Sequence, residues 1–340
     1  MRDNKSVDGR LEEELKYGFY GRLKAEFPSQ IIADITEVCN LACIHCPHSE
    51  FKKSGHYAAR HLEPELNAKM VDEVRQYGRG ITQYIRYASN GEPLLHPHGY
   101  EMIEYAARHS GVFVTLTTNG TIMNEKRTQK LLDSGVHMID ISIDAFSPET
   151  YAKIRINGDL NVTRANVLSL IGMVKTSKAK TKVVVSYVDQ PLNMHETKNF
   201  KSFWEDNGAD FVVIRRLHSC SGAKPELAAQ IKKYNTDVKR RPCLYPWERI
   251  VLNAKGYLTF CPADWFHGSP VVDFRTTTIR EAWRGEFYRE LREAHLSNDF
   301  SKFLFCGQCP DWEATRWPWE GRSYADMIQE FIEDKRGDNE

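Results

Sequence analysis

The stretch Ile31-Ile-Ala-Asp-Ile-Thr36 is followed after two residues by Cys39-Asn-Leu-Ala-Cys43-Ile-His-Cys46. The apolar run predicts a short buried strand, and the second stretch places three thiols on the loop directly after it. Thiolates are soft ligands that suit iron–sulfur clusters, and three of them leave one iron of a four-iron cluster open. The alternative is a zinc site, which would need a fourth ligand such as His45 or His48, although the spacing is not the usual one for zinc.

Short β-branched runs alternate with longer amphipathic stretches from residue 31 to about residue 216. The expected strands are Ile31–Thr36, Ile81–Ala88, Val112–Thr118, Met138–Ile143, Lys182–Val188 and Phe211–Arg216. The expected helices are Pro64–Tyr77, Tyr100–Ser110, Glu125–Ser134, Asn161–Thr176 and His195–Asn207. This alternation indicates an α/β fold of parallel βαβ units, either an open, partial (β/α) barrel or a doubly wound sheet. In both arrangements the chemistry belongs at the carboxyl ends of the strands.

The alternation stops after Arg216, which indicates a second, smaller module. Residues 221–242 predict a polar, partly helical connection, and residues 250–260 predict a β-hairpin with its turn at Asn253–Gly256. A helix is expected over Thr278–Ala294 and another near residues 322–335.

The composition is that of a soluble globular protein whose Lys+Arg and Asp+Glu both number 46. This balance argues against nucleic-acid binding, which needs a net basic face. The sequence contains no run of about 18 apolar residues, so a membrane span is not expected. The N-terminus lacks the apolar core of a secretory signal. We therefore expect a cytoplasmic protein. In that reducing compartment, clustered cysteines indicate metal binding or catalysis rather than disulfides.

Five of the eight cysteines lie outside the first loop. Cys243 and Cys261 flank the predicted hairpin, and Cys306 and Cys309 form a C-x₂-C pair. Considered alone, these four are typical of a structural zinc site. Cys220 stands apart and is expected to be a buried, inert thiol.

The first cysteine loop, in its position after the first strand, resembles that of the radical S-adenosylmethionine (radical SAM) superfamily. Further matches follow in order: Ala88–Pro93 is similar to the family's "GGEP" segment, and Thr117–Gly120 and Ile141–Asp144 end the next two strands. The resemblance implies a partial (β/α)6 TIM-like barrel in which Cys39, Cys43 and Cys46 hold a [4Fe–4S] cluster. It also implies that S-adenosylmethionine is contacted by Asn90, Gly91, Glu92, Pro93, Thr118, Asn119, Ser142 and Asp144. One departure is His45, where the family often has an aromatic residue.

The pattern of the four later cysteines, with four residues between Gly256 and Cys261, resembles the SPASM/twitch modules that follow many radical SAM barrels. The resemblance implies a small α+β domain in which Cys243, Cys261, Cys306 and Cys309 hold one auxiliary [4Fe–4S] cluster. A second auxiliary cluster is not expected, because no cysteine follows Cys309. The expected domains are an N-terminal extension (1–29), the barrel (30–220), a connection (221–242), the auxiliary-cluster domain (243–312) and a C-terminal helical tail (313–340).

The resemblance also implies an activity. S-adenosylmethionine would be cleaved reductively to a 5′-deoxyadenosyl radical that takes hydrogen from the substrate, with the auxiliary cluster accepting an electron. The cysteine spacing is similar to that of members of the 2-deoxy-scyllo-inosamine dehydrogenase type, which oxidise an aminocyclitol alcohol. Only about 30 residues precede the first strand, too few for a peptide-recognition domain, so a sugar, cyclitol or sugar nucleotide is the expected small-molecule substrate. A flavodoxin or ferredoxin type protein is the expected electron donor.

Other activities stay open within the same family. They are maturation or epimerisation of a ribosomally made peptide, and epimerisation or decarboxylation of a sugar. A remote alternative is a non-catalytic iron–sulfur or zinc protein.

Five residues are candidates for substrate chemistry. Arg215 and Arg216 end the sixth strand, and one of them should face the barrel mouth, where it would bind a substrate hydroxyl, carboxylate or phosphate unless it pairs with a neighbouring helix. Tyr187 and Asp189 end the fifth strand and are candidates for proton transfer. Cys220 would return a hydrogen atom if the reaction were an epimerisation.

Overall fold

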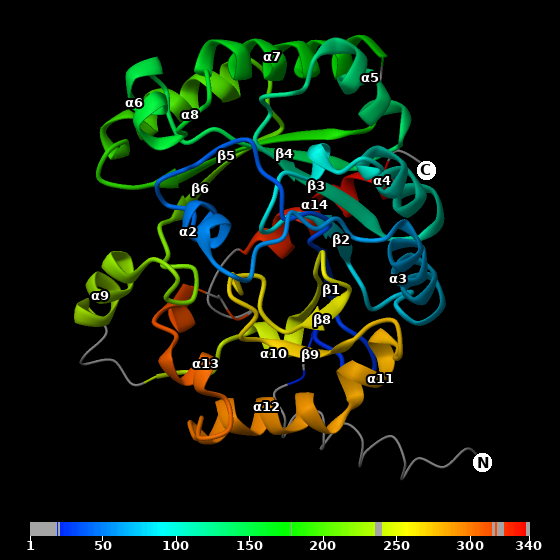
Figure 1. The fold of residues 1–340 in the computed structure, drawn as a ribbon. Coiled ribbons are helices and arrows are strands. Elements are labelled where there is room, and N and C mark those ends of the chain that lie inside the picture. The colour runs from blue at the N-terminus through cyan, green and yellow to red at the C-terminus, as the bar shows by residue number, and fades with distance from the viewer. Residues whose placement is uncertain are drawn as a thin grey trace.

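Residues 19, 21–177, 179–234, 240–314, 317 and 323–337 are described by a computed structural model. A curved sheet runs through the middle of the molecule, with one set of helices outside it and a second set beneath it (Figure 1). Most of the predicted extension (1–29) and parts of the predicted tail (313–340) lie outside the described residues. None of the described helices is both long enough and apolar enough to cross a membrane.

Six parallel strands form the barrel part of the sheet, in the spatial order β6-β5-β4-β3-β2-β1. They are β1 (Gln30–Ala33), β2 (Tyr84–Tyr87), β3 (Phe113–Thr118), β4 (Met138–Ser142), β5 (Lys182–Asp189) and β6 (Phe211–Arg216). All six lie within the predicted ranges or within one residue of them. The predicted α/β fold with a partial parallel barrel is confirmed.

Helices connect these strands and cover one face of the sheet. They are α2 (His48–Lys53), α3 (Pro64–Tyr77), α4 (Gly99–His109), α5 (Glu125–Asp133), α6 (Pro148–Ile154), α7 (Leu160–Ser177), α8 (Thr197–Asp206) and α9 (Pro225–Tyr234), with short 3₁₀ turns η1 (Pro93–Leu95) and η2 (Met194–Glu196). The five predicted helices are confirmed to within about two residues. The short helices α2 and α6 were not predicted, although Ser147 before Pro148 is an N-cap signal that α6 uses.

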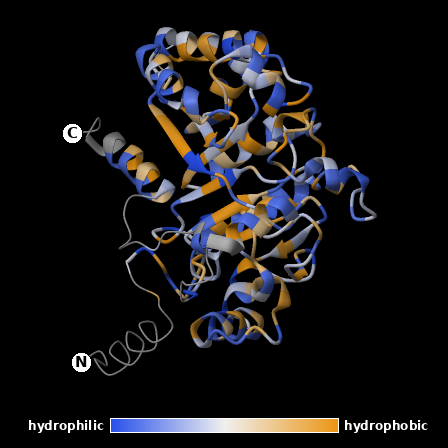
Figure 2. Ribbon diagram, turned by 90° about the vertical axis from the view of Figure 1, so that its left-hand side faces the viewer, coloured by the Kyte–Doolittle hydropathy of each residue, from blue (hydrophilic) through white to orange (hydrophobic). Residues whose placement is uncertain are grey.

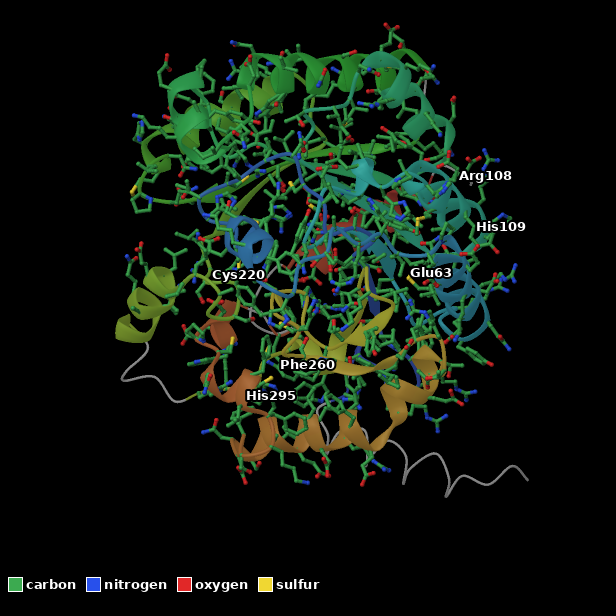
Figure 3. All side chains as sticks on the ribbon, viewed as in Figure 1. Glu63, Arg108, His109, Cys220, Phe260 and His295 are labelled. Atoms are coloured by element: carbon green, nitrogen blue, oxygen red, sulfur yellow. The ribbon has the colours of Figure 1, made fainter. Side chains whose placement is uncertain are left out.

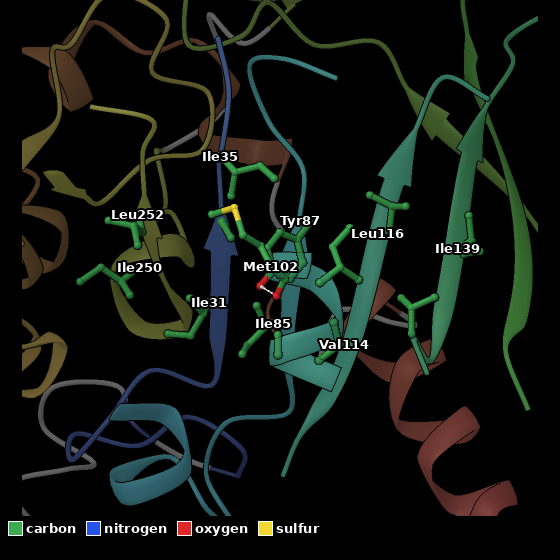
Figure 4. Close-up of a cluster of buried hydrophobic side chains, with 14 of the residues drawn as sticks. Ile31, Ile35, Ile85, Tyr87, Met102, Val114, Leu116, Ile139, Ile250 and Leu252 are labelled. Atoms are coloured by element: carbon green, nitrogen blue, oxygen red, sulfur yellow. Dashed lines mark hydrogen bonds between the residues drawn. The ribbon is translucent and has the colours of Figure 1, made fainter. Parts of the chain in front are cut away.

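Alternate side chains of each strand face two different layers. Ile31, Ile85, Val114 and Ile139 face the outer helices in the main core, and Figure 4 shows them along neighbouring strands. The intervening residues, among them Ile32, Tyr84, Phe113, Met138 and Val184, face the other side of the sheet. There they pack on Ile328 and Phe331 of α14 (Tyr324–Gly337). The hydropathy colouring of Figure 2 shows hydrophobic residues concentrated on the central strands.

The second module continues the barrel sheet. Strand β7 (Arg249–Leu252) pairs in parallel with β1, with Ile31 opposite Ile250. The hairpin to β8 (Tyr257–Thr259) and the further strand β9 (Pro270–Asp273) then extend the sheet to nine strands. The predicted hairpin and its turn are confirmed, because Gly256 has a φ of +84° and its N–H bonds to the Asn253 carbonyl.

The helix predicted over Thr278–Ala294 is interrupted. The structure has α11 (Ile279–Arg284) and α12 (Glu286–Ser297), because Gly285 between them has an extended ψ of 170°. The prediction of one helix was therefore wrong at this glycine, a poor helix former. The module is completed by α10 (Tyr245–Glu248), α13 (Leu304–Gln308) and η3 (Asp311–Ala314).

Candidate active site

The first three cysteines lie on one loop after β1, and neighbouring backbone holds this loop in place. The Ala42 N–H donates to the Ile156 carbonyl at 3.0 Å, and the Ile44 N–H donates to the Ile154 carbonyl at 3.0 Å. None of the eight cysteines forms a disulfide bond. The loop is thus fixed against the end of α6 with its thiols available as ligands.

The three thiols lie close enough to affect one another. The pKa of Cys39 is raised to about 11, mainly by burial and in part by the neighbouring charges of Glu92 and Cys43. Burial also raises the pKa of Cys46 well above its usual value, with added effects from Cys43 and Cys39. Buried thiols give up their protons readily only to a metal, which supplies the compensating positive charge. Three such thiols on one loop fit the ligand set of a [4Fe–4S] cluster with one open iron.

The two histidines considered for zinc each contact another group. The His48 Nε2 lies 2.8 Å from the Glu37 carbonyl, and the His45 Nε2 lies 3.5 Å from the Asp144 carboxylate. Within the described part of the chain, no three His, Cys, Asp or Glu side chains are placed to hold a single metal ion.

Asp144, a predicted S-adenosylmethionine contact, is engaged by the protein itself. Its Oδ2 accepts hydrogen bonds from Arg155 Nε at 2.8 Å and Nη2 at 2.5 Å, and its Oδ1 accepts the Val188 N–H at 2.7 Å. The carboxylate is fully buried, and the Arg155 side chain is only 8% exposed. Burial raises the pKa of the Cys43 thiol, and the nearby positive charge of Arg155 opposes that effect. The pair therefore ties the ends of β4 and β5 to the cysteine loop. Sequence analysis missed Arg155, because no motif marks it.

Glu92 brings the predicted cofactor loops after β2 and β3 together. Its Oε1 accepts a hydrogen bond from Thr118 Oγ1 at 2.7 Å, and its Oε2 accepts one from the Asn119 N–H at 2.7 Å. Asn119 Nδ2 in turn donates to Asn40 Oδ1, on the cysteine loop, at 2.9 Å. Burial raises the pKa of Glu92, although these donors oppose that effect. The Glu92 carboxylate thus acts as a brace between loops.

Ser89 and Asn90, which precede Glu92, connect the barrel to the second module. Asn90 Nδ2 donates to the Asp264 carbonyl at 3.3 Å, and Ser89 Oγ donates to the Pro262 carbonyl at 2.8 Å. At Gly91 a Cβ atom would lie 2.1 Å from the Thr36 carbonyl oxygen, so that only glycine fits. Of the other predicted contacts, Pro93 begins η1, and the half-buried Ser142 ends β4.

A charged cluster lies on the inner face of the sheet, the face that α14 covers. Arg215 Nη2 donates to Asp140 Oδ2 at 2.8 Å, and Arg86 Nη2 donates to the same oxygen at 3.2 Å. The Tyr324 hydroxyl, from α14, also donates to this oxygen at 3.2 Å. Two guanidinium groups thus share one fully buried carboxylate, and the Arg215 side chain keeps 30% of its surface exposed. Arg216 is exposed, which is expected from strand alternation.

Tyr187 and Asp189 lie away from this cluster. The Tyr187 hydroxyl donates to the Asn193 carbonyl at 2.5 Å, and its ring lies 4.5 Å from that of Phe200 on α8. Asp189 Oδ1 accepts from Thr197 Oγ1, at the start of α8, at 3.0 Å. Both side chains therefore contact the outer helix layer, whereas Arg215 faces the opposite side. The geometry gives the expected proton-transfer roles no support, because Tyr187 is fully buried against α8.

The four later cysteines come from three segments and converge. Burial raises the pKa of the Cys306 thiol, with further effects from the nearby Cys243 and Cys309. Burial raises the pKa of the Cys261 thiol well above its usual value, and the nearby Cys309 and Cys243 raise this pKa as well. Arg240 Nη2 supports the site by donating to the Cys306 carbonyl at 2.6 Å. Four converging thiols fit a fully ligated iron–sulfur cluster.

Cys220 is buried, as expected, but it is not isolated. Its Sγ lies 4.0 Å from the His45 carbonyl, and it packs with Phe51, Trp265 and the ligand candidate Cys46. Burial raises the pKa of this thiol to about 12. Figure 3 shows Cys220 between the α2 segment and the module that carries Phe260 and His295.

Comparison with known proteins agrees with this architecture. Residues 34–202 match the radical SAM superfamily, and residues 243–310 match the iron–sulfur cluster-binding domain called SPASM. A probable GTP 3′,8-cyclase of Methanocaldococcus jannaschii is 29% identical over 180 residues, which are 53% of this chain and 56% of that relative. The match thus spans little more than half of the relative's length.

Solved structures share the fold at low sequence identity. BtrN in complex with AdoMet and 2-DOIA has a TM-score of 0.57 at 17% identity, covering 83% of this chain and 92% of that one. SuiB of Streptococcus suis bound to the precursor peptide SuiA has a TM-score of 0.63 at 12% identity, covering 97% and 79%. With both domains matched in order and the thiols placed as described, the chain belongs to the radical SAM superfamily, with a radical SAM domain followed by a SPASM domain.

Proposed function

We propose that this radical SAM enzyme oxidises a small polar substrate, such as a sugar, cyclitol or sugar nucleotide. The observation that carries the proposal is the second set of converging thiols, Cys243, Cys261, Cys306 and Cys309, which is present in addition to the first cysteine loop. A cluster held by Cys39, Cys43 and Cys46 would, with S-adenosylmethionine, supply hydrogen-atom abstraction, and a cluster held by the four later cysteines would supply a one-electron acceptor. A substrate alcohol that lost one hydrogen atom, one electron and the hydroxyl proton would become a carbonyl.

The chain's own residues would position the reactants. Cys39, Cys43 and Cys46 would hold the first cluster, and the loops braced by Glu92 and by the Asp144–Arg155 pair would surround S-adenosylmethionine. The braces keep these loops fixed, and such fixed positioning favours a reaction between precisely placed atoms.

Arg215 is the candidate for substrate binding. It lies on the inner face of the sheet, shares Asp140 with Arg86 and is partly exposed. Because two positive groups face one negative group, the cluster retains positive charge. That charge supports binding of a substrate hydroxyl, carboxylate or phosphate.

Anaerobic reconstitution tests the proposal. The wild-type chain should bind about eight iron atoms, release 5′-deoxyadenosine after reduction with dithionite, and convert an aminocyclitol to a product lighter by about two mass units. The Cys306→Ala/Cys309→Ala variant should hold about half of that iron, still cleave S-adenosylmethionine and form no oxidised product. Cys220→Ala serves as the matched control and should keep its iron. Full product from the double variant, or zinc in place of iron, would refute the proposal.

Peptide modification is the second candidate function. It is favoured by the fold similarity to SuiB bound to a precursor peptide, which extends over 97% of this chain. The same assay separates the two functions, because a change in the mass of an added peptide, with the aminocyclitol left unchanged, would select this one.

A further inference from the structure

The loop Ser219–Ser221, after β6, lies between the two sets of cysteines. On one side the Cys220 Sγ lies 4.0 Å from the His45 carbonyl in the first cysteine loop, and Cys46 of that loop packs against the cluster that Cys220 forms with Phe51 and Trp265. On the other side Ser221 Oγ lies 3.5 Å from the Cys261 Sγ, in the second set. Two successive residues thus contact the two sites.

The conformation of this loop is unusual. Cys220 and Ser221 have φ values of +53° and +58°, in the left-handed region that non-glycine residues rarely adopt. Asp311, two residues after Cys309, holds them there. Its Oδ2 accepts from the Ser221 N–H at 2.7 Å and from Ser219 Oγ at 2.8 Å, and its Oδ1 accepts from the Ser219 N–H at 2.9 Å.

Glycine would adopt the conformation of residue 221 without strain, and the next residue, Gly222, does so at a φ of +93°. Glycine, however, has no hydroxyl. The strained position therefore carries a side chain that glycine could not replace, and that side chain contacts a sulfur atom.

We propose that the Ser221 hydroxyl donates a hydrogen bond to the Cys261 sulfur and thereby raises the reduction potential of the auxiliary cluster. A donor to a ligand sulfur stabilises the more negative, reduced cluster, and hydrogen bonds to the sulfurs are among the factors that set such potentials. Ser221 is thus a tuning residue that makes the cluster a better electron acceptor. This inference rests on the auxiliary cluster of the proposed function.

The test is a redox titration followed by electron paramagnetic resonance. It uses the full chain and also the Cys39→Ala/Cys43→Ala/Cys46→Ala variant, in which only the auxiliary signal would remain. Ser221→Ala and Ser221→Gly should each lower the equilibrium constant for one-electron reduction about tenfold, which is about 59 mV. Ser219→Ala is the matched control, since Ser219 Oγ contacts Asp311 and not a cysteine. Ser219→Ala should leave the equilibrium constant for one-electron reduction within about a factor of two of the wild-type value.

The outcomes separate the two proposals. An unchanged potential in Ser221→Ala, or an equal drop in Ser219→Ala, overturns the role of the hydroxyl and leaves the proposed function intact. The role of the hydroxyl is also overturned if Ser221→Ala lowers the potential but Ser221→Gly does not. Both variants lack the hydroxyl, so the difference would come from the position of the loop. If neither the full chain nor the three-cysteine variant shows an auxiliary cluster signal, both proposals fail.

Discussion

Replacing Arg155 by methionine should destabilise the protein strongly. The substitution keeps a long apolar side chain but removes the guanidinium that donates two hydrogen bonds to Asp144. Asp144 is fully buried, so its charge would remain without that partner inside the protein. Breaking a buried pair in this way costs about 3–5 kcal/mol. Arg155 also lies near the Cys43 thiol, where its positive charge favours the deprotonated form that binds iron, so we expect reduced iron binding as well.

Urea denaturation of the iron-free protein measures the change in unfolding free energy, and iron analysis after reconstitution measures the second effect. The matched control is Arg275→Met. Arg275 pairs with Glu63 at 2.9 Å, but the two side chains are 41% and 56% exposed. An exposed pair contributes only about 0–1 kcal/mol. If Arg155→Met cost no more than Arg275→Met, burial of the pair would not be what makes it important. The double variant Asp144→Asn/Arg155→Met should recover part of the loss.

Three further predictions concern other parts of the molecule. Arg215→Met should lower kcat/KM about tenfold or more while S-adenosylmethionine cleavage persists, because a charge-assisted hydrogen bond contributes about 1.5–3 kcal/mol. Unchanged kinetics would show that Arg215 does not bind the substrate. Gly91→Ala should lower the iron bound in reconstitution to about half, because its Cβ would meet the Thr36 carbonyl at 2.1 Å just before the first cysteine loop, whereas the four later cysteines are untouched. Normal iron content would show that the loop can shift. Burial raises the pKa of Glu73 from 4.5 to about 7, so the folded state holds more protons and stability falls as pH rises through that window. Denaturation at pH 5 and pH 8 should show a smaller pH dependence in Glu73→Gln, and an unchanged dependence would contradict this.

Local sequence patterns were sufficient to predict the parallel βαβ units, and the resemblance to the radical SAM superfamily then favoured a partial barrel over a doubly wound sheet. The six strands are apolar runs separated by amphipathic helices, and both signals lie within a few neighbouring residues. The pairing of β7 with β1 could not be predicted, because a strand of four residues does not specify which partner lies beside it. The same limit applies to α14, whose helical pattern does not indicate that it covers the inner face of the sheet.

The candidate site was predicted unevenly. The spacing of the cysteines marks both thiol sets, since close ligands leave a pattern in sequence. The proton-transfer role predicted for Tyr187 has no support in the geometry, and strand alternation places its side chain on the helix side of the sheet, as it does those of Val183 and Val185. Arg155 leaves no such pattern, because its importance comes from a tertiary contact with Asp144.

The parallel pairing of β1 with β7 has a consequence for cutting the chain. Any fragment that ends before residue 249 would leave the backbone donors and acceptors of β1 without this neighbour. A fragment that begins after the barrel would do the same to β7. Bare strand edges recruit other strands and cause aggregation. The boundary between the two matched domains is therefore a boundary in sequence only, and neither half is a natural unit for expression by itself.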